Sequence, residues 1–162
     1  MTENKNVLFV DFNGVLSYKP FWYYLSEESH EHHNYWNLIQ DYLFKNNIEI
    51  VKKWMVGDYT SEDIHNLLES NLDISYDTLY PIFVETCKNI DISEPILDQV
   101  RMLKNKYYTV LITDNMDCFD RYTKPNNPKM LEAFDQIDNS YNLKTLKASN
   151  NGKYFVVTKK KK

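Results

Sequence analysis

Hydrophobic and polar positions along the chain predict an alternation of buried strands and helices. One apolar run, Val7–Val10, leads directly into Asp11. A second run of β-branched and aromatic residues, Tyr107–Ile112, leads into Thr113. Such runs are typical of strands buried on both faces of a parallel sheet. Because open α/β sheets place their chemistry at the carboxyl ends of their strands, Asp11 and Thr113 are the first candidates for a functional site.

The dipeptide Asn13-Gly14, directly after the first run, allows two interpretations. Glycine permits a sharp turn and a close approach of the backbone to a ligand. Asn-Gly between apolar residues is also a strong signal for a two-residue β-hairpin. This stretch alone leaves both open. A calcium-binding EF-hand loop is excluded, because Val15 and Leu16 occupy positions that need a ligand and a glycine.

From residue 35 to residue 90 the pattern is helical. Apolar residues recur at intervals of three and four, which predicts one buried stripe; they are Tyr35, Leu38, Ile39, Tyr42 and Leu43, continued by Ile48, Val51, Trp54 and Met55. Gly57 is expected to end this helix, and Thr60 or Ser61 to cap the next one. Ser75 is expected to open a further helix. The segment therefore predicts a helical bundle inserted between two strands.

The rest of the chain returns to mixed structure. Pro95 suits the first turn of a helix that precedes the second strand. A short helix over 129–133 and a brief third strand within 134–140 are expected after that strand. A turn at 150–152 is expected to lead into a last strand over 153–158.

Two clusters between the first strand and the bundle have structural interpretations. Aromatic residues over 18–25 are expected to pack in a core rather than contact a ligand. His30, His32 and His33 match no tetrahedral metal pattern, so a solvated helix start is the preferred interpretation. His65 is isolated and is given no role.

Composition narrows the class of protein. A chain of 162 residues is long enough for one domain with a sizeable core. Its formal net charge of -4 gives no reason to expect a nucleic-acid partner. Cys87 and Cys118 stand alone, which fits a reducing, cytoplasmic setting. The polar N-terminus and the short apolar run after it fit neither a signal peptide nor a membrane span. Nothing in the sequence indicates the oligomeric state.

Asp11, Thr113 and Lys147 together resemble the motifs of the haloacid dehalogenase-like (HAD) hydrolase superfamily. The stretch 7–16 is similar to the first motif, an apolar strand followed by Asp-x-Asp-Gly. The stretch 110–115 is similar to the second, a strand ending in Ser or Thr, often followed by Asn. Ser140 to Lys147 resembles the third, for which Lys144 and Lys153 are alternative lysines.

This resemblance covers nearly the whole chain and implies an α/β fold. A Rossmann-like parallel sheet core would comprise residues 1–16 and 93–162, and an inserted α-helical cap would comprise residues 17–92. The implied function is that of a Mg²⁺-dependent phosphatase acting on a small organic phosphate.

The resemblance also implies roles for individual residues. Asp11 would be the nucleophile that forms an aspartyl-phosphate. Thr113 would hydrogen-bond a phosphoryl oxygen, and Lys147 would supply positive charge to the nucleophile and the phosphate. Mg²⁺ would be held by Asp11 and by the backbone carbonyl of Asn13.

Two further residues, Gly14 and Asn115, would line the phosphate site by the same resemblance. Gly14 follows the first strand, and Asn115 follows the second. Both are therefore expected at the same edge of the sheet.

The chain departs from the family pattern in two places. Asn13 replaces the aspartate that exchanges a proton with the leaving group, and an amide cannot do so. No acid follows the expected last strand, which ends at Thr158 and Lys159. We therefore expect a truncated member with weakened Mg²⁺ binding. Two alternatives remain open: a catalytically inactive binding or regulatory protein of the same fold, and a metal-independent dehalogenase.

Overall fold

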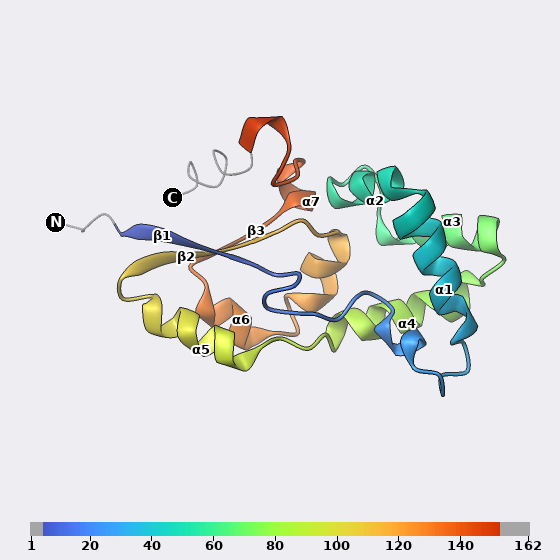
Figure 1. Cartoon of the computed structure of the whole chain (residues 1–162), viewed down its shortest axis with the longest axis horizontal. Coiled ribbons are helices and arrows are strands. Elements are labelled where there is room, and N and C mark those ends of the chain that lie inside the picture. Colours follow the sequence, from blue (N-terminus) through green and yellow to red (C-terminus); the bar gives the residue numbers. More distant parts are fainter. Residues whose placement is uncertain (1–4, 153–162) are drawn as a thin grey trace.

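A three-stranded parallel sheet organises the part of the chain that the computed structural model describes, residues 5–152. The strands are β1 (Asn6–Asp11), β2 (Tyr107–Thr113) and β3 (Gln136–Asn139), in that spatial order (Figure 1). The predicted α/β class with a parallel sheet is confirmed. The strand expected over 153–158 lies outside the described residues.

Parallel pairing brings the ends of the strands to one edge of the sheet. Asp11, the last residue of β1, pairs with Ile112, and Thr113, the last residue of β2, pairs with Asn139. The hairpin interpretation of Asn13-Gly14 is wrong, because β1 pairs with β2 and not with the residues that follow it. Instead the chain makes a tight loop in which the Gly14 N–H donates to the Ser17 carbonyl at 2.8 Å.

The helices fall into two groups along the chain. Four α-helices lie between β1 and Ser93: α1 (Asn34–Ile39), α2 (Ile48–Met55), α3 (Ser61–Leu72) and α4 (Tyr76–Lys88). They follow a 3₁₀ turn over Tyr23–Ser26, and a π-helix, η2 (Gln40–Asn46), joins α1 to α2. The other helices are α5 (Glu94–Leu103), the π-helix η3 (Phe119–Thr123), α6 (Pro128–Ala133), α7 (Ser140–Leu143) and a 3₁₀ turn over Asn150–Gly152.

The start and end signals of the inserted helices are confirmed with one exception. Thr60 caps α3 through a reciprocal capping box with Asp63. Gly57 has a φ of 80° just after α2, as a C-terminal glycine requires. The expected continuous helix over 35–55 is interrupted at Asn47, whose backbone is not helical. The Asn47 side chain donates to the Tyr42 carbonyl at 2.9 Å, which satisfies an acceptor at the end of the π-helix.

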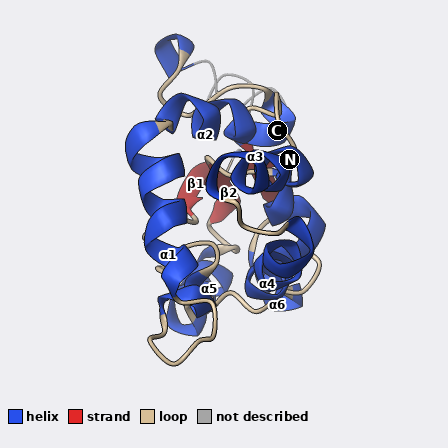
Figure 2. Cartoon of the chain, turned by 90° about the vertical axis from the view of Figure 1, so that its right-hand side faces the viewer, coloured by secondary structure: helices blue, strands red, loops and turns tan. Residues whose placement is uncertain are grey.

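The inserted helices and the sheet have separate hydrophobic cores. Trp22, Trp54 and Phe83 are fully buried in the first core. The second core lies between the sheet and the pair α5 and α6, which cover one face of it (Figure 1). Figure 2 shows α1 to α4 from their own end, with the strands behind them. Trp22 is fully buried, as expected for aromatic residues over 18–25 that pack in a core, whereas Tyr18 is 78 % exposed and the expectation is wrong for it.

The two connections between these parts run side by side. The Ser93 N–H, just before α5, donates to the Leu16 carbonyl, just after β1, at 2.8 Å. The division at residues 16/17 and 92/93 stays a prediction. Among the described residues no helix is long and apolar enough to cross a membrane.

A buried carboxylate fixes the inserted helices to the segment after β2. Asp117, only 4 % exposed, accepts hydrogen bonds from Trp54 Nε1 at 2.8 Å and from the Ser61 hydroxyl at 2.7 Å. Arg121 Nη1 donates to Oδ2 of Asp117 at 2.8 Å, and the same guanidinium group also pairs with Glu62. The Arg121 hydrogen bond is the main cause that lowers the pKa of Glu62 to about 2.

Removing this carboxylate should destabilise the fold. We expect Asp117→Ala to lower the free energy of unfolding by roughly 3 kcal/mol, because buried donors lose their acceptor. Urea denaturation measures the change. Asp98→Ala is the control, since the Asp98 side chain is 65 % exposed in its pair with Arg101 and should cost less than about 1 kcal/mol. Equal effects of the two substitutions would contradict this account.

His65, which has no role in the sequence analysis, is a fully buried core residue. Its Nδ1 lies 2.7 Å from the Ser61 carbonyl, and its Nε2 lies 3.3 Å from Trp22 Nε1. These partners require a neutral ring with the proton on Nδ1. Burial lowers the pKa of His65 from 6.5 to about 4.

The buried histidine should make stability depend on pH. In the unfolded chain His65 takes up a proton near pH 6.5, whereas the folded chain resists it down to about pH 4. Stability is therefore full above pH 6.5 and falls as the pH drops from 6.5 to 4, by on the order of 3 kcal/mol. Urea denaturation across this range should show a smaller fall for His65→Gln than for the unaltered protein. Parallel curves for the two would refute the assignment.

Candidate functional site

An acid–base pair lies at the carboxyl end of β1. Lys147 Nζ lies 2.5 Å from Oδ2 of Asp11, although 136 residues separate them in sequence. The other carboxylate oxygen of Asp11 accepts the Phe12 N–H at 2.7 Å, and the side chain remains 38 % exposed. Asp11 is therefore oriented by two donors and still reachable from solvent.

Asp114 positions the loop that carries the lysine. Its Oδ1 accepts the backbone N–H of Lys147 at 2.9 Å. Burial raises the pKa of Asp114, the contacts with Lys147 lower it, and the charge of Asp11 adds a smaller increase. Two carboxylates thus share the surroundings of one ammonium group.

Of the three candidate lysines, Lys147 is the one in contact with Asp11. Lys144 Nζ instead lies 3.2 Å from the Gly57 carbonyl and 4.6 Å from the centre of the Tyr141 ring. Lys153 lies outside the described residues. The geometry therefore favours Lys147 for the role of the third motif, which stays a proposal.

Thr113 is the last residue of β2, and Asn115 lies two residues after it. Thr113 is fully buried, and Asn115 is 1 % exposed. The Asn115 N–H donates to Asn139 Oδ1 and to the Ser140 hydroxyl, while its own Oδ1 accepts the Met116 N–H at 2.9 Å. These contacts join the end of β2 to the end of β3, so Asn115 shapes the edge of the sheet.

Asn13 and Gly14 lie on the exposed loop after β1. Asn13 Nδ2 donates to the Asp114 carbonyl at 3.4 Å, which joins the loops that follow β1 and β2. Gly14 has a φ of 75°, and no atom would lie within 4 Å of an added Cβ. Its backbone therefore borders open space, as a ligand-binding turn requires.

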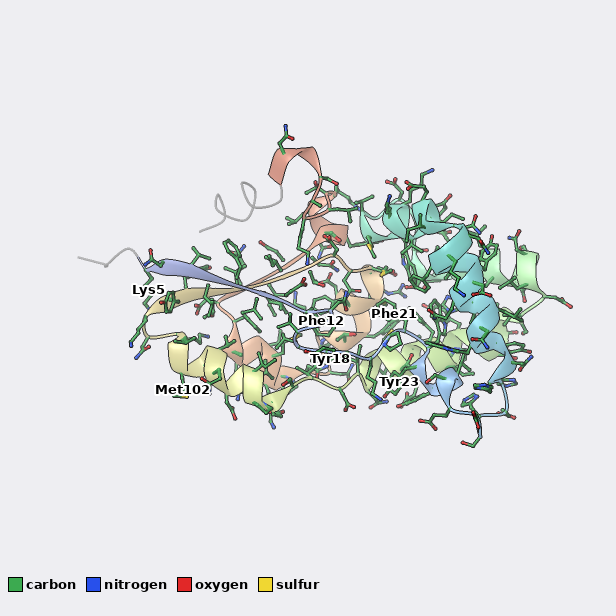
Figure 3. The ribbon with its side chains drawn as sticks, in the orientation of Figure 1. Lys5, Phe12, Tyr18, Phe21, Tyr23 and Met102 are labelled. Carbon is green, nitrogen blue, oxygen red and sulfur yellow. The ribbon has the colours of Figure 1, made fainter. Side chains whose placement is uncertain are left out.

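A pocket of about 470 Å³ opens beside this loop. Asn13, Gly14 and Asp114 line it on the side of the sheet, and Phe21 and Gln40 line it on the side of the inserted helices. Figure 3 labels Phe12 at the end of β1, and Tyr18 and Phe21 on the segment that leads to the helices. The predicted site residues on the first loop thus adjoin a space between the two parts of the chain.

The donor set of this edge suits a hard cation bound weakly. The described part of the chain has no group of three or more His, Cys, Asp or Glu side chains placed to hold a metal. Asp11 and Asp114 offer carboxylates, and Mg²⁺ is commonly bound through one or two carboxylates together with waters and substrate phosphates. The residues present therefore fit Mg²⁺ that shares its coordination with a phosphate.

The sequence matches no family model and no curated protein. The chain has the fold of HAD family enzymes, as comparison with solved structures shows. The HAD family enzyme BT-2542 of Bacteroides thetaiotaomicron is similar over 98 % of this chain and 79 % of its own, with 16 % identity and a TM-score of 0.69.

Two further structures show the same likeness. The wild-type form of BT-2542, in complex with magnesium and inorganic phosphate, matches 97 % of this chain and 79 % of its own with 16 % identity and a TM-score of 0.70. A predicted HAD-like family hydrolase of Porphyromonas gingivalis matches 98 % of this chain and 77 % of its own with 14 % identity and a TM-score of 0.61. The fold implied by the sequence motifs is therefore confirmed.

Sequence reasoning missed Asp114 and Gln40 as parts of the site. Asp114 stands inside the second motif, between Thr113 and Asn115, so its position at the sheet edge was a usable signal. Gln40 stands in an ordinary helical stretch, and only the fold places it beside the loop after β1.

The pair of Asp11 and Lys147 predicts where an anion binds. Lys147→Met should weaken the binding of inorganic phosphate by at least about tenfold, because a charged hydrogen bond is lost. Isothermal titration calorimetry measures this affinity. Lys144→Met removes the same charge from a neighbouring lysine and should leave the affinity unchanged. Equal losses in both variants would place the anion elsewhere.

Proposed function

We propose that the protein is a HAD-like hydrolase that removes phosphate from a small organic molecule through a covalent intermediate on Asp11. One observation carries this proposal: the Asp11 carboxylate lies at a strand end, paired with Lys147, and Asn13, two residues further along the chain, lines a pocket. The fold shared with HAD family enzymes, one of them bound to magnesium and phosphate, adds support.

In the proposed reaction the Asp11 carboxylate attacks phosphorus. The bond from phosphorus to Asp11 forms as the bond to the leaving oxygen breaks, and the electron pair departs with that oxygen. Water then hydrolyses the acyl phosphate and releases inorganic phosphate. Lys147 offsets negative charge on the phosphoryl oxygens, and Thr113 is assigned the hydroxyl that donates to one of them.

Mg²⁺ fits this site as a partner of the phosphate. We assign Asp11 and the Asn13 backbone carbonyl to hold it, as expected from the sequence. When bound, the ion supplies positive charge that stabilises the transferring phosphoryl group. Lys147 already neutralises part of the charge of Asp11, which is consistent with weak binding of the metal.

The first test is phosphate release from a panel of small phosphate esters with Mg²⁺ present. Asp11→Asn should abolish release, because an amide oxygen does not form the covalent intermediate. Asp98→Asn, an exposed substitution of the same kind, should leave release unchanged. Absence of release from every ester would overturn the proposal.

Restoring the missing acid should raise activity. Asn13→Asp introduces a group that can protonate the leaving oxygen, a contribution of ~10²–10⁴ in rate. The gain should be largest for alkyl phosphates, whose leaving group needs a proton, and small for aryl phosphates. Steady-state kinetics on both classes measures it, and a gain that does not depend on the leaving group would contradict the role given to this position.

Asn13 also favours a second candidate, a binding protein that holds a phosphate without turning it over. The amide replaces the group that exchanges protons, while Lys147 remains in place to attract an anion. Phosphate binding without release from any ester would support this candidate over the hydrolase.

A further inference from the structure

We infer that the pocket beside Asn13 binds an aromatic leaving group, so that the substrate is an aryl phosphate with a hydrogen-bond acceptor on the ring. The inference rests on the proposed function for the position of the phosphate. The chemistry of the pocket depends on its own side chains.

Apolar side chains from separate elements form the wall. Phe21 comes from the segment after β1, Phe44 from the π-helix η2, Met55 from α2 and Met116 from the loop after β2. Aromatic and thioether side chains of this kind pack well on the faces of an aromatic ring. A sugar or polyol would leave its hydroxyls without partners against such a wall, at a cost for each one.

Gln40 is the polar feature that selects the ring substituent. Its Nε2 has no hydrogen-bond partner in the described part of the chain and is covered by neighbouring side chains, so a ligand acceptor reaches it when the Gln40 side chain turns toward the pocket that it lines. Because a buried donor without a partner is costly, a ligand atom that accepts from it gains that free energy. Gln40 and Phe44 lie four residues apart on the π-helix η2, a rare conformation that is frequent at functional sites.

The charges around the pocket argue against a second phosphate. Lys19 lines it, but its Nζ lies over the Tyr23 ring, 5.2 Å from the ring centre. Asp114, also in the lining, is acidic. A nucleoside polyphosphate would therefore be repelled by the Asp114 carboxylate, and Lys19, which already contacts the Tyr23 ring, would be its cationic partner in the lining. A neutral aromatic ring is not repelled and needs no cation.

The chemistry of Asn13 leads to the same substrate class independently. Asn13 cannot protonate the leaving oxygen, so that oxygen must carry the electron pair away as an anion. A phenolate does this far more readily than an alkoxide. The pocket volume of about 470 Å³ lies in the usual range for small-molecule sites and accommodates a substituted benzene ring.

Two substrates of matched shape test the role of Gln40. 4-Acetylphenyl phosphate carries an acceptor on the ring, and 4-isopropylphenyl phosphate does not. The ratio of their kcat/KM values is measured for the unaltered protein and for Gln40→Leu. Comparing the two ratios cancels the difference in intrinsic reactivity between the two esters. The ratio should fall about three- to tenfold in Gln40→Leu, the value of one neutral hydrogen bond.

Asn46→Leu is the matched control, since Asn46 is exposed on the same π-helix and its change from amide to leucine lies outside the pocket lining. The ratio should stay unchanged in that variant. An equal ratio in all three proteins would overturn the inference, as would glycerol phosphate being hydrolysed as efficiently as the aryl esters.

A binding measurement separates this inference from the proposed function. Titration calorimetry with 4-hydroxyacetophenone and 4-isopropylphenol needs no catalysis. Tighter binding of the first phenol, lost in Gln40→Leu and kept in Asn46→Leu, upholds the pocket assignment even if no ester is hydrolysed. Failure of both phenols to bind overturns it even if esters are hydrolysed.

Discussion

The contact between Asp11 and Lys147 is the interaction on which the site depends. It joins the end of the first strand to a loop 136 residues later, so it exists only when the sheet has formed in the correct register. The parallel pairing of β1 with β2 fixes Asp11, and the Asp114 carboxylate fixes the backbone of Lys147. Each partner is therefore placed by the fold rather than by the attraction between the charges, which is small for partly exposed groups.

Much of this architecture was predictable because its signals are local. Apolar runs that end in Asp11 and Thr113 define two strands, and Gly57 and Thr60, three residues apart, mark a helix end and a helix start. The strand ends meet because parallel strands share an edge. The predicted fold follows from these signals together.

What could not be predicted depends on contacts between distant segments. His65 looks isolated in sequence, yet it lies in the core between Trp22 and Ser61. Gln40 lies in an ordinary helical stretch of the sequence, and only the folded chain places it in the pocket lining. The Asn-Gly pair left two interpretations open because its hairpin signal is local, whereas the pairing of β1 with β2 that prevails is long-range.

The paired connections at Leu16 and Ser93 have a mechanical consequence. They form a natural axis about which the inserted helices could swing away from the sheet. Two hydrogen bonds between the inserted helices and the rest of the chain oppose that movement. Trp54 Nε1 donates to Asp117, and the Ser140 hydroxyl donates to the Met55 carbonyl at 2.7 Å. The space between the two parts thus keeps its shape through the folded chain itself. A rigid ligand that binds in this space orders the protein little further. Its affinity therefore depends mainly on shape and hydrogen bonding, with little free energy spent on reorganising the protein.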